Sequence, residues 1–377
     1  MKIVLAPNAF KESLTAGETA RAMAQGVHRA MPDAQTVLCP MADGGDGSAE
    51  AMLAACVGRW IRRKVQGPLG DPVMGRYAWL ESERTAFIEM AEVSGLRLLS
   101  PKQRNPLKTS TYGTGQLIAD ALDRGARRVL VGIGGSATVD CGCGMAQALG
   151  AKLLDAKGNA LKSGGGALSK LARVDLSGLH PVIAKTKIEA ACDVTNPLTG
   201  KQGGIQVYSP QKGATPRMLE ALEAGAKNFA RVVRRDLGPS VGRIPGAGAA
   251  GGLGAGLIAF LNAELRPGAE LIADAVRLDE RLQGASLVIT GEGKIDGQTR
   301  FGKAPAEVMR RAKAAGIPCV ALCGAIGDNV NKLRPIGMTS VHSICDAPMP
   351  LEHAMRNAKS LLRNAAENLI RLWLSSR

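Results

Sequence analysis

The chain has 377 residues, of which 45% are hydrophobic and 21% are charged. This composition excludes an intrinsically disordered protein, and the length suffices for two domains that each bury a core. The formal net charge is +15, but aromatic residues make up only 3% and the basic residues are spread along the chain. Both features disfavour nucleic-acid binding, so we expect the positive charge either to serve anionic small molecules or to form a solvated surface.

The N-terminal apolar run at residues 3–6 is too short for a signal peptide and ends at Pro7. No later segment reaches the roughly twenty uncharged apolar residues that span a membrane. We therefore expect a cytoplasmic protein with no membrane partner. The eight cysteines contain no CxxC pair and are interpreted as reduced, mostly buried thiols, with a metal or redox role for Cys141 and Cys143 as the alternative.

The two ends of the chain show the same alternation of strand and helix. A strand at residues 3–6, a helix at 14–30 and a strand at 36–39 form a predicted βαβ unit. The C-terminal part continues this pattern with predicted strands at 287–290, 320–323 and 340–344, a helix after 304 and a long closing helix from 351. We interpret both ends as parts of one parallel sheet.

A second α/β series lies between the two ends, at residues 77–80, 86–90, 114–124, 129–150 and 188–192. Glycine-rich segments around Gly164 and Gly248 are too patterned for linkers and too flexible for a core. We predict an α/β protein with a discontinuous domain of residues 1–66 and 285–377 and an inserted α/β domain of residues 67–284. The expected active site is the interdomain cleft.

The segment VLVGIGGSATVDCGCGMAQALG carries the strongest local signal. Its apolar run breaks at Gly134 and Gly135, where the backbone can turn and approach a ligand, and Ser136 and Thr138 add hydroxyls. A following helix would offer unpaired N–H groups and a positive dipole end, so the pattern is typical of a phosphate or carboxylate site. A tight turn without a ligand is the alternative.

Two familiar motifs lack their usual context. The sequence GAGAAG at residues 246–251 fits GxGxxG but follows no clear strand, so a nicotinamide-dependent oxidoreductase is a weaker alternative. The sequence GQTRFGK at residues 297–303 fits seven P-loop positions, but Ala304 replaces the Ser or Thr that ligates Mg²⁺.

Acidic residues lie in glycine-containing loops at apparent strand ends, namely Asp43, Asp46, Asp140, Asp193, Glu292 and Asp296. The carboxyl ends of strands are where open α/β sheets bind ligands, and carboxylates there can hold Mg²⁺ or accept a proton. Lysines accompany these loops, namely Lys11, Lys212, Lys294 and Lys303. Turn residues, helix caps and solvated lysines are the alternatives, but together these groups supply what phosphoryl transfer needs.

Nine motifs, in order along nearly the whole chain, resemble one family. They are PNAFKESLTA, MADGGDGS, FIEMAEVSGL, NPLKTSTYGTG, GIGGSATVDCGCGM, CDVTNPLTG, PQKGATP, GAGAAGGLGAGLIAFLNAELRPG and VITGEGKIDGQTRFGKAP. The family that they resemble is the bacterial glycerate kinase family of the type that forms 2-phosphoglycerate. The resemblance implies one Rossmann-like and one flavodoxin-like domain, and phosphorylation of D-glycerate by ATP and Mg²⁺ in glyoxylate and sugar-acid breakdown.

From the loops and this resemblance we hypothesise in-line transfer of the ATP γ-phosphoryl group to the C2 hydroxyl of D-glycerate. Asp193 is the expected general base, with Lys11 and Asp296 as further catalytic residues and with Asp43 and Asp46 as metal ligands. The expected substrate- or ATP-binding residues are Asn8, Ser13, Gly44, Gly45, Gly134, Gly135, Ser136, Asp140, Asn196, Lys212, Glu292, Gln298 and Lys303. A monomer or homodimer with small-molecule substrates is expected, and a catalytically weak sensor of glycerate or nucleotide is the alternative.

The chain departs from the family pattern in three places. The usual PDSFK reads PNAFK, so that Asn8 loses a charge that would bind Mg²⁺ or the glycerate hydroxyls. ATNDGG reads ATVDCG, which places Val139 and Cys141 in the loop and retains Asp140, and GEGRIDSQT reads GEGKIDGQT. Asn8 is therefore expected to lower the efficiency of the reaction.

Overall fold

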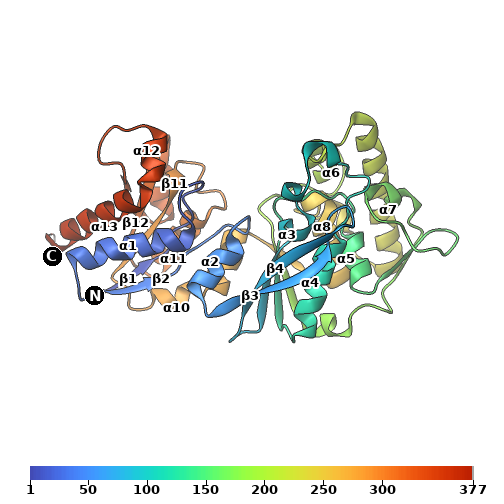
Figure 1. The fold of residues 1–377 in the computed structure, drawn as a ribbon, viewed down its shortest axis with the longest axis horizontal. Coiled ribbons are helices and arrows are strands. Elements are labelled where there is room, and N and C mark those ends of the chain that lie inside the picture. The colour runs from blue at the N-terminus through green and yellow to red at the C-terminus, as the bar shows by residue number, and fades with distance from the viewer. Residues whose placement is uncertain (376–377) are drawn as a thin grey trace. The chain divides into compact units, whose positions relative to one another are not determined.

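The computed structural model describes residues 1–375, which form two compact α/β units (Figure 1). Among the described residues, the first unit contains residues 1–43, 50–57 and 267–375, and the second contains residues 44–49 and 58–266. This confirms the predicted α/β class. Among the described helices none has the length and apolar character needed to cross a membrane.

The sheet of the first unit is entirely parallel, with the strand order β13-β12-β11-β1-β2. Its strands are β1 (Lys2–Leu5), β2 (Gln35–Leu38), β11 (Leu287–Ile295), β12 (Cys319–Ile326) and β13 (Met338–Ser343). The N-terminal and C-terminal parts of the chain therefore share one sheet, as predicted. The continuous apolar runs of β1, β11 and β12 suit strands that are covered on both faces.

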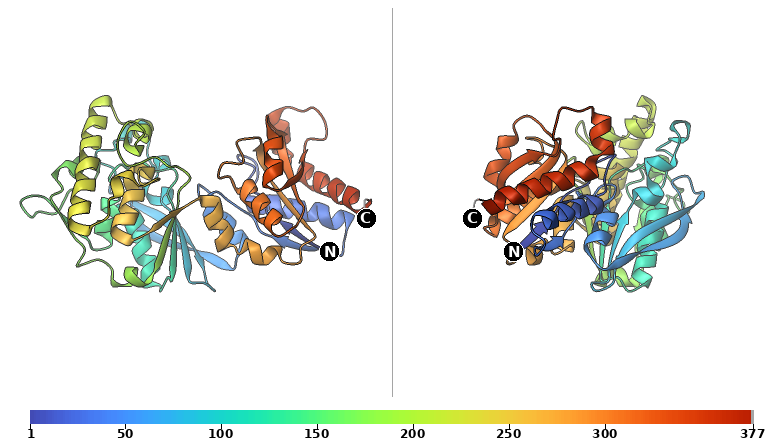
Figure 2. Two further views of the ribbon diagram at one scale, coloured as in Figure 1. Left: turned by 180° about the vertical axis from the view of Figure 1, so that it is seen from behind. Right: turned by 60° about the vertical axis from the view of Figure 1, so that its left-hand side comes forward.

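Helices cover both faces of this sheet. On one face α1 (Ala16–Ala30) packs beside α13 (Ala358–Ser375), and both views in Figure 2 show them side by side. Helix α11 (Ala304–Ala314) packs on β11 and β12, together with α9 (Gly268–Ala275) and α10 (Leu278–Leu282). A capping box between Thr15 and Glu18 begins α1.

The predicted closing helix from residue 351 is two helices rather than one. Helix α12 (Leu351–Arg356) ends at Asn357, whose backbone leaves the helical region. The carbonyl of Asn357 then accepts the N–H groups of Ser360 and Leu361 and so begins α13. An asparagine between two helical turns favours such a break because its side chain competes for backbone hydrogen bonds.

The second unit contains a mixed sheet with the order β10-β9-β6-β5-β4-β3. Strands β5, β6, β9 and β10 are parallel, whereas β4 pairs antiparallel with both β5 and β3. The bounds are β3 (Gly58–Gln66), β4 (Pro72–Leu80), β5 (Thr85–Glu89), β6 (Arg128–Gly132), β9 (Lys187–Ala191) and β10 (Glu264–Arg266). The carboxyl ends of the four parallel strands consequently point to one edge of the sheet.

The helices of the second unit build its large core. The main helices are α4 (Tyr112–Asp123), α5 (Cys143–Ala148), α6 (Gly204–Tyr208), α7 (Pro216–Leu237) and α8 (Ala249–Leu261). Shorter elements are α3 (Ala91–Ser94), the hairpin of β7 (Lys152–Leu154) with β8 (Arg173–Asp175), and several 3₁₀ turns. Helix α2 (Ser48–Ala55) belongs to the first unit from Glu50 onward. One of these 3₁₀ turns, Gly165–Lys170, lies in the glycine-rich segment around Gly164.

The glycine-rich segment around Gly248 is buried core, which corrects the prediction that it is too flexible for one. A Cβ atom on Gly251 would lie 1.9 Å from the carbonyl oxygen of Thr138, and one on Gly252 would lie 2.7 Å from the Cys141 Sγ. Both glycines also have positive φ. Close backbone packing thus explains the GxGxxG pattern without a dinucleotide.

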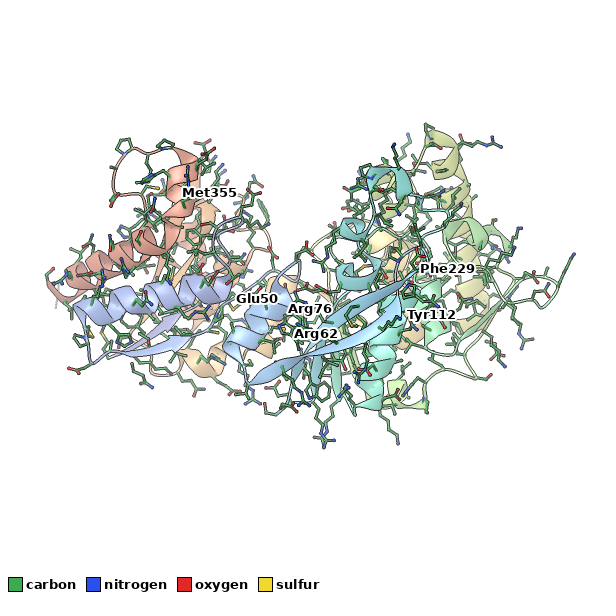
Figure 3. All side chains as sticks on the ribbon, in the orientation of Figure 1. Glu50, Arg62, Arg76, Tyr112, Phe229 and Met355 are labelled. Carbon is green, nitrogen blue, oxygen red and sulfur yellow. The ribbon has the colours of Figure 1, made fainter. Side chains whose placement is uncertain are left out.

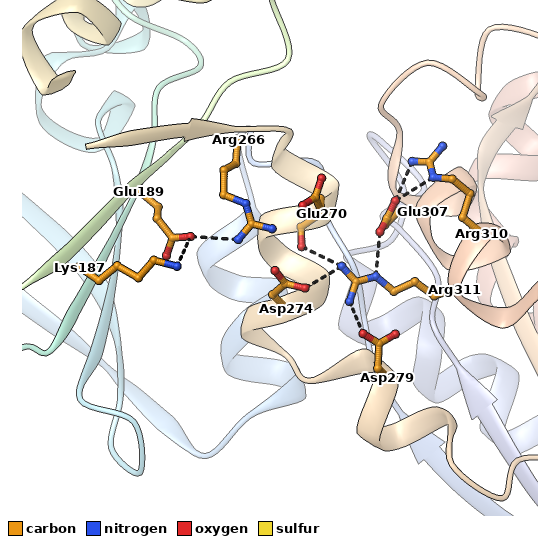
Figure 4. Close-up of polar contacts among 9 residues, drawn as sticks. All are labelled: Lys187, Glu189, Arg266, Glu270, Asp274, Asp279, Glu307, Arg310 and Arg311. Atoms are coloured by element: carbon orange, nitrogen blue, oxygen red, sulfur yellow. Dashed lines mark hydrogen bonds and ion pairs between the residues drawn. The ribbon is translucent and has the colours of Figure 1, made fainter. Parts of the chain in front are cut away.

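The predicted domain boundaries were 66/67 and 284/285, whereas the units of the structure change at 57/58 and 266/267. Strand β3 pairs with β4 along its whole length, from Gly58 to Gln66, which places it in the second unit. Strand β10 closes the same unit, where Arg266 and Lys187 each lie 3.0 Å from the buried carboxylate of Glu189 (Figure 4).

Residues 267–284 belong to the first unit because an arginine ties them to α11. The guanidinium of Arg311 lies 2.7 Å from both Asp274 and Asp279, on α9 and α10 (Figure 4). It also lies 2.8 Å from Glu307 on its own helix. A partly buried arginine with several carboxylate partners fixes geometry better than exposed pairs do.

Candidate active site

The first unit has a topological switch point between β1 and β11. From β1 the chain continues to β2 on one side, whereas from β11 it continues to β12 and β13 on the other. Open α/β sheets bind ligands outside the carboxyl ends of strands at such a point. Asn8 follows β1, Asp43 follows β2 and Glu292 lies in the carboxyl half of β11, so three predicted residues lie at this edge.

A pocket of about 570 Å³ opens at the carboxyl edge of the first unit, and we call it the β11 pocket. Its lining includes residues 9–13, residues 292–294 and part of α12. The structure thereby brings together six of the predicted or noted polar residues, namely Lys11, Ser13, Asp43, Glu292, Lys294 and Lys303.

Glu292 is the buried carboxylate of the β11 pocket. Its Oε1 accepts a hydrogen bond from the Thr299 hydroxyl at 3.1 Å and lies 3.6 Å from the Nζ of Lys303. Burial raises the pKa of Glu292 above its usual value, while the Lys303 ammonium offsets part of this rise. Lys303 immediately precedes α11 without capping it by a side-chain hydrogen bond. This arrangement places a cation and a helix N-terminus beside one carboxylate, which suits an anion accompanied by a cation.

Asp296 and Gln298 lie in a neighbouring hollow of about 280 Å³ with Lys294. The backbone N–H of Gln298 donates to the Asp296 Oδ1 at 2.9 Å, and this bond lowers the pKa of Asp296 below its usual value. Lys294 lies 3.6 Å from the same carboxylate. Asp296 therefore remains ionised and shapes the turn that leads to α11.

Two residues of the PNAFKES segment are held by local hydrogen bonds. The buried Asn8 accepts from the Ala9 N–H at 2.8 Å, and its own N–H donates to the Gly291 carbonyl at 2.8 Å. The Ser13 hydroxyl donates to the Met355 carbonyl at 2.7 Å. Ser13 thus ties the segment to α12, and its oxygen is left with acceptor capacity only.

In the second unit the predicted anion loop follows β6. Gly135 has φ +69°, and Gly134 and Gly135 are exposed whereas Ser136 is buried. The expected helix does not start there, because α5 begins only at Cys143. The loop is therefore a backbone turn with a hydroxyl, without the dipole of an adjoining helix.

Asp140 takes the place of a ligand at the start of α5. This buried carboxylate accepts hydrogen bonds from the N–H groups of Thr111, Gly142 and Gly144 and from the hydroxyls of Thr111 and Ser110, at 2.8 to 3.3 Å. Burial raises its pKa, and the bonds from Thr111 and Gly144 oppose the rise. Five donors from the protein itself thus occupy its oxygens, and the contact of Asp140 with substrate or ATP stays a prediction.

Lys212 lies beneath the same loop rather than on the surface. Its Nζ donates to the Ser136 hydroxyl at 2.7 Å and to the Thr138 carbonyl at 2.9 Å. The side chain is 1% exposed, and burial lowers its pKa to about 7, against the opposing charge of Asp140. Lys212 consequently fixes the position of the Ser136 hydroxyl and of the loop backbone at Thr138.

Asp193 and Asn196 both follow β9. Asp193 is exposed at the carboxyl edge. Asn196 donates to the Gln202 carbonyl at 2.7 Å and accepts from the Tyr208 hydroxyl at 2.7 Å. The Asn196 amide is thus occupied by its own loop, which is a structural use that the sequence pattern did not reveal.

The segment with Gly44, Gly45 and Asp46 packs on the second unit beside a carboxylate that the sequence analysis missed. Glu89 ends β5, is buried, and accepts from the Ala49 N–H at 2.9 Å. A Cβ on Gly132 would lie 2.8 Å from the Gly44 carbonyl, and one on Gly134 would lie 3.6 Å from the Gly45 Cα. Burial raises the pKa of Glu89, and the charge of Asp46 adds to the rise. Glu89 follows an apolar run, which could have identified it from the sequence as a residue at a strand end. It was missed because no glycine adjoins it, unlike most of the acidic residues that were predicted.

No group of three or more His, Cys, Asp or Glu side chains within residues 1–375 is arranged to hold a metal ion. This includes Cys141 and Cys143, whose pKa values burial raises well above the usual range. Mg²⁺ in kinases needs only one or two carboxylates besides phosphate oxygens. One carboxylate from each unit, Asp43 of the first and Asp46 of the second, would meet this requirement.

The comparisons with known proteins agree along the whole chain. A sequence model of the glycerate kinase family matches residues 3–374. A Halalkalibacterium halodurans protein named glycerate kinase is 48% identical over 97% of this chain and 97% of its own length. An Escherichia coli K12 protein named glycerate 2-kinase is 45% identical over 98% of this chain and 97% of its own. A crystal structure from Salmonella typhimurium LT2, described as a candidate glycerate kinase 2, matches with a TM-score of 0.92 at 47% identity, over 100% of this chain and 98% of that one.

Proposed function

The chain belongs to the glycerate kinase family, and we propose that it transfers the γ-phosphoryl group of ATP to the C2 hydroxyl of D-glycerate. The products are then 2-phosphoglycerate and ADP, in glyoxylate or sugar-acid catabolism. The relative named glycerate 2-kinase supports the position of transfer. The observation that carries the proposal is the Glu292–Lys303 pair at the switch point of the first unit, at 3.6 Å, because phosphoryl transfer relies on cations and positioned carboxylates.

Asp193 is the proposed general base. Its exposed carboxylate follows β9 at the carboxyl edge of the second unit, where a substrate hydroxyl has access to it. As the C2 oxygen attacks the γ-phosphorus, Asp193 accepts the hydroxyl proton and the phosphorus–oxygen bond to ADP breaks. Ser136, held by Lys212, donates its hydroxyl proton to the glycerate carboxylate.

Lys11 and Lys303 are proposed to oppose the negative charge of the phosphates, and both line the β11 pocket. Asp43 of the first unit and Asp46 of the second are the candidate Mg²⁺ ligands. When bound, the ion neutralises phosphate charge and orients the phosphoryl group. Asp296 acts through the turn that precedes α11, because its Oδ1 holds the Gln298 N–H.

A coupled assay tests this function. The purified chain is supplied with Mg²⁺, ATP and D-glycerate, and ADP release is followed before enolase is added. Enolase consumes 2-phosphoglycerate directly but needs a mutase for 3-phosphoglycerate. An immediate enolase signal supports a 2-kinase, whereas ADP release without that signal overturns the proposed position of transfer.

A catalytically weak sensor of glycerate or nucleotide is the second candidate, and Asn8 is the observation that favours it. In the family pattern an acid stands at this position, whereas here the side chain is a buried amide that accepts a hydrogen bond from Ala9. Binding of glycerate or ATP without ADP release would favour the sensor over the kinase.

A further inference from the structure

We propose that the β11 pocket binds the purine nucleotide, with the base against an apolar wall formed by Phe10, Met349, Leu351 and Met355 and with the phosphates toward Lys11 and Lys303. This inference rests on the proposed function only in taking ATP as the co-substrate. With ATP bound to the first unit, glycerate is expected to bind at the Ser136 loop of the second unit.

The lining of the pocket combines two chemically different sets of residues. Leu351 and Met355 on α12, together with Met349 and Phe10, are the apolar set, and Figure 3 labels Met355 on this helix. Lys11, Lys303 and the carboxylates Asp43 and Glu292 are the charged set. We assign these sets to an apolar end of the site, for the base, and a cationic end, for the phosphates. A ligand that is flat and apolar at one end and anionic at the other matches this division.

The apolar end is suited to an aromatic base. Methionine side chains adapt their shape and make favourable sulfur contacts with aromatic rings, and the pocket wall has two of them, Met349 and Met355. Leu351 is 75% exposed, although it lies beside these residues in the pocket lining. No part of the protein covers the Leu351 side chain fully, and a base stacked on it would remove it from water.

Gly293 keeps the floor of the pocket open. A Cβ atom on this residue would have no neighbour closer than the Lys11 N and the Phe10 Cα, both at 4.0 Å. In the same strand, a Cβ on Gly291 would lie 2.0 Å from the Leu322 carbonyl oxygen. Packing inside the protein therefore requires glycine at 291 but not at 293. The missing side chain at 293 instead preserves room in the lining of the pocket.

The cationic end is suited to phosphates. Lys303 precedes α11, an eleven-residue helix whose first N–H groups have no side-chain cap. Pro305 in the first turn has no N–H, and the N–H groups of Ala306 and Glu307 donate to the Lys303 carbonyl at 3.1 and 3.3 Å. The lysine ammonium and the positive end of the helix dipole, rather than free N–H groups, therefore favour phosphate oxygens here. Glu292 lies 3.6 Å from this ammonium and is placed to interact with a metal ion or ribose hydroxyl at the same end.

Two variants of the full chain test the assignment. Gly293→Val places carbon atoms in the pocket on a strand that tolerates β-branched residues, and Leu351→Gln changes an exposed side chain that the fold does not need. Leu374→Gln on α13 is the matched control, because Leu374 is 40% exposed and lies outside the pocket lining. Circular dichroism and thermal melts verify that each variant is folded.

The readout is equilibrium binding of a fluorescent ADP that carries an N-methylanthraniloyl group on its ribose. We expect the dissociation constant to rise about fivefold in Leu351→Gln and by more than tenfold in Gly293→Val, and to be unchanged in Leu374→Gln. Adenosine should compete with the probe in the wild type and lose potency in Leu351→Gln. Inorganic triphosphate should compete equally in both, because it contacts only the phosphate end.

Wild-type affinity for the probe in both pocket variants overturns the proposal, and so does a loss of triphosphate competition in Leu351→Gln. If Gly293→Val does not fold, Leu351→Gln decides, since its side chain is on the surface. The binding assay contains no glycerate. If the variants bind the probe more weakly and the wild type releases no ADP with glycerate, the nucleotide site is supported and the proposed function is rejected.

Discussion

The ammonium nitrogen of Lys212 lies 2.7 Å from the hydroxyl oxygen of Ser136, and both residues are buried. Because the lysine donates to this oxygen, the Ser136 proton is free to point toward a ligand. The pKa of Lys212 is lowered to about 7 by burial. The positive charge of Lys212 beneath the Ser136 loop is therefore lost close to neutral pH.

The first prediction concerns glycerate affinity. Lys212→Met should raise the KM for glycerate about tenfold, because the loop loses the charge that orients Ser136, while the KM for ATP should stay constant. In the wild type the KM for glycerate should rise above about pH 7, where Lys212 becomes neutral. Initial rates from pH 6 to 9 measure both effects, with Lys201→Met, which removes an exposed lysine, as the control. An identical pH profile for Lys212→Met and the wild type would contradict the role.

The second prediction concerns stability and the same lysine. The folded state loses the Lys212 proton near pH 7, whereas the unfolded chain keeps it up to about pH 10.5. Between these values the unfolded state binds more protons, so this group makes the free energy of unfolding increase with pH, by at most about 1.4 kcal/mol per unit. Lys212→Met should remove that increase and be more stable than the wild type at pH 6. Urea midpoints from pH 6 to 10 test this, and parallel curves would show that Lys212 is not the titrating group.

The third prediction concerns the proposed general base. Asp193→Asn should lower kcat by about 10²- to 10⁴-fold, because the amide cannot accept the C2 hydroxyl proton, with little change in KM for ATP. Asp123→Asn, at a 72% exposed side chain on α4, serves as the control for removing one negative charge. A melting temperature equal to that of the wild type would show that the fold is intact. A rate within a few-fold of the wild type would remove Asp193 from the mechanism.

The positions of strands were easier to predict from the sequence than the roles of the polar residues. Strands β1, β11 and β12 are buried parallel strands, so their continuous apolar runs were visible without a structure. Helix α7 was missed, although Thr215 caps it and Gly238 follows its end. A threonine N-cap and a glycine after the last turn are ordinary signals of a helix, so α7 was predictable from the sequence.

Polar site residues could not be separated by pattern alone. Asp140 and Asp193 both follow apolar runs, yet five donors saturate Asp140 while Asp193 is exposed. Only tertiary packing makes that distinction. Glycine patterns are ambiguous in the same way, since Gly251 is required by the Thr138 carbonyl whereas Gly293 has space around it.

The fourth prediction concerns Glu89. Its pKa is raised by burial, so as pH rises above about 4.5 the unfolded chain loses this proton before the folded chain does, and the stability falls. Glu89→Gln keeps the acceptor for the Ala49 N–H and removes the titration. The variant should therefore be more stable than the wild type at pH 7 and equal to it at pH 4. Urea midpoints across this range test the prediction, with Glu50→Gln on α2, an exposed position labelled in Figure 3, as the control.

The fifth prediction concerns Asn8. Asn8→Asp restores the family's acid at a position that is 7% exposed. A buried carboxylate is costly without a cation, so the variant should be less stable than the wild type in a chelator. If this position binds Mg²⁺, millimolar Mg²⁺ with ADP should recover the lost stability, and the apparent Mg²⁺ constant for turnover should fall several-fold. Melts with and without Mg²⁺–ADP measure the effect, and Asn8→Ala separates loss of the Ala9 hydrogen bond from gain of charge. A carboxylate that ligates Mg²⁺ loses its burial cost when the ion binds, so Mg²⁺ should stabilise Asn8→Asp more than the wild type. If Mg²⁺ stabilises both proteins equally, the ion binds elsewhere.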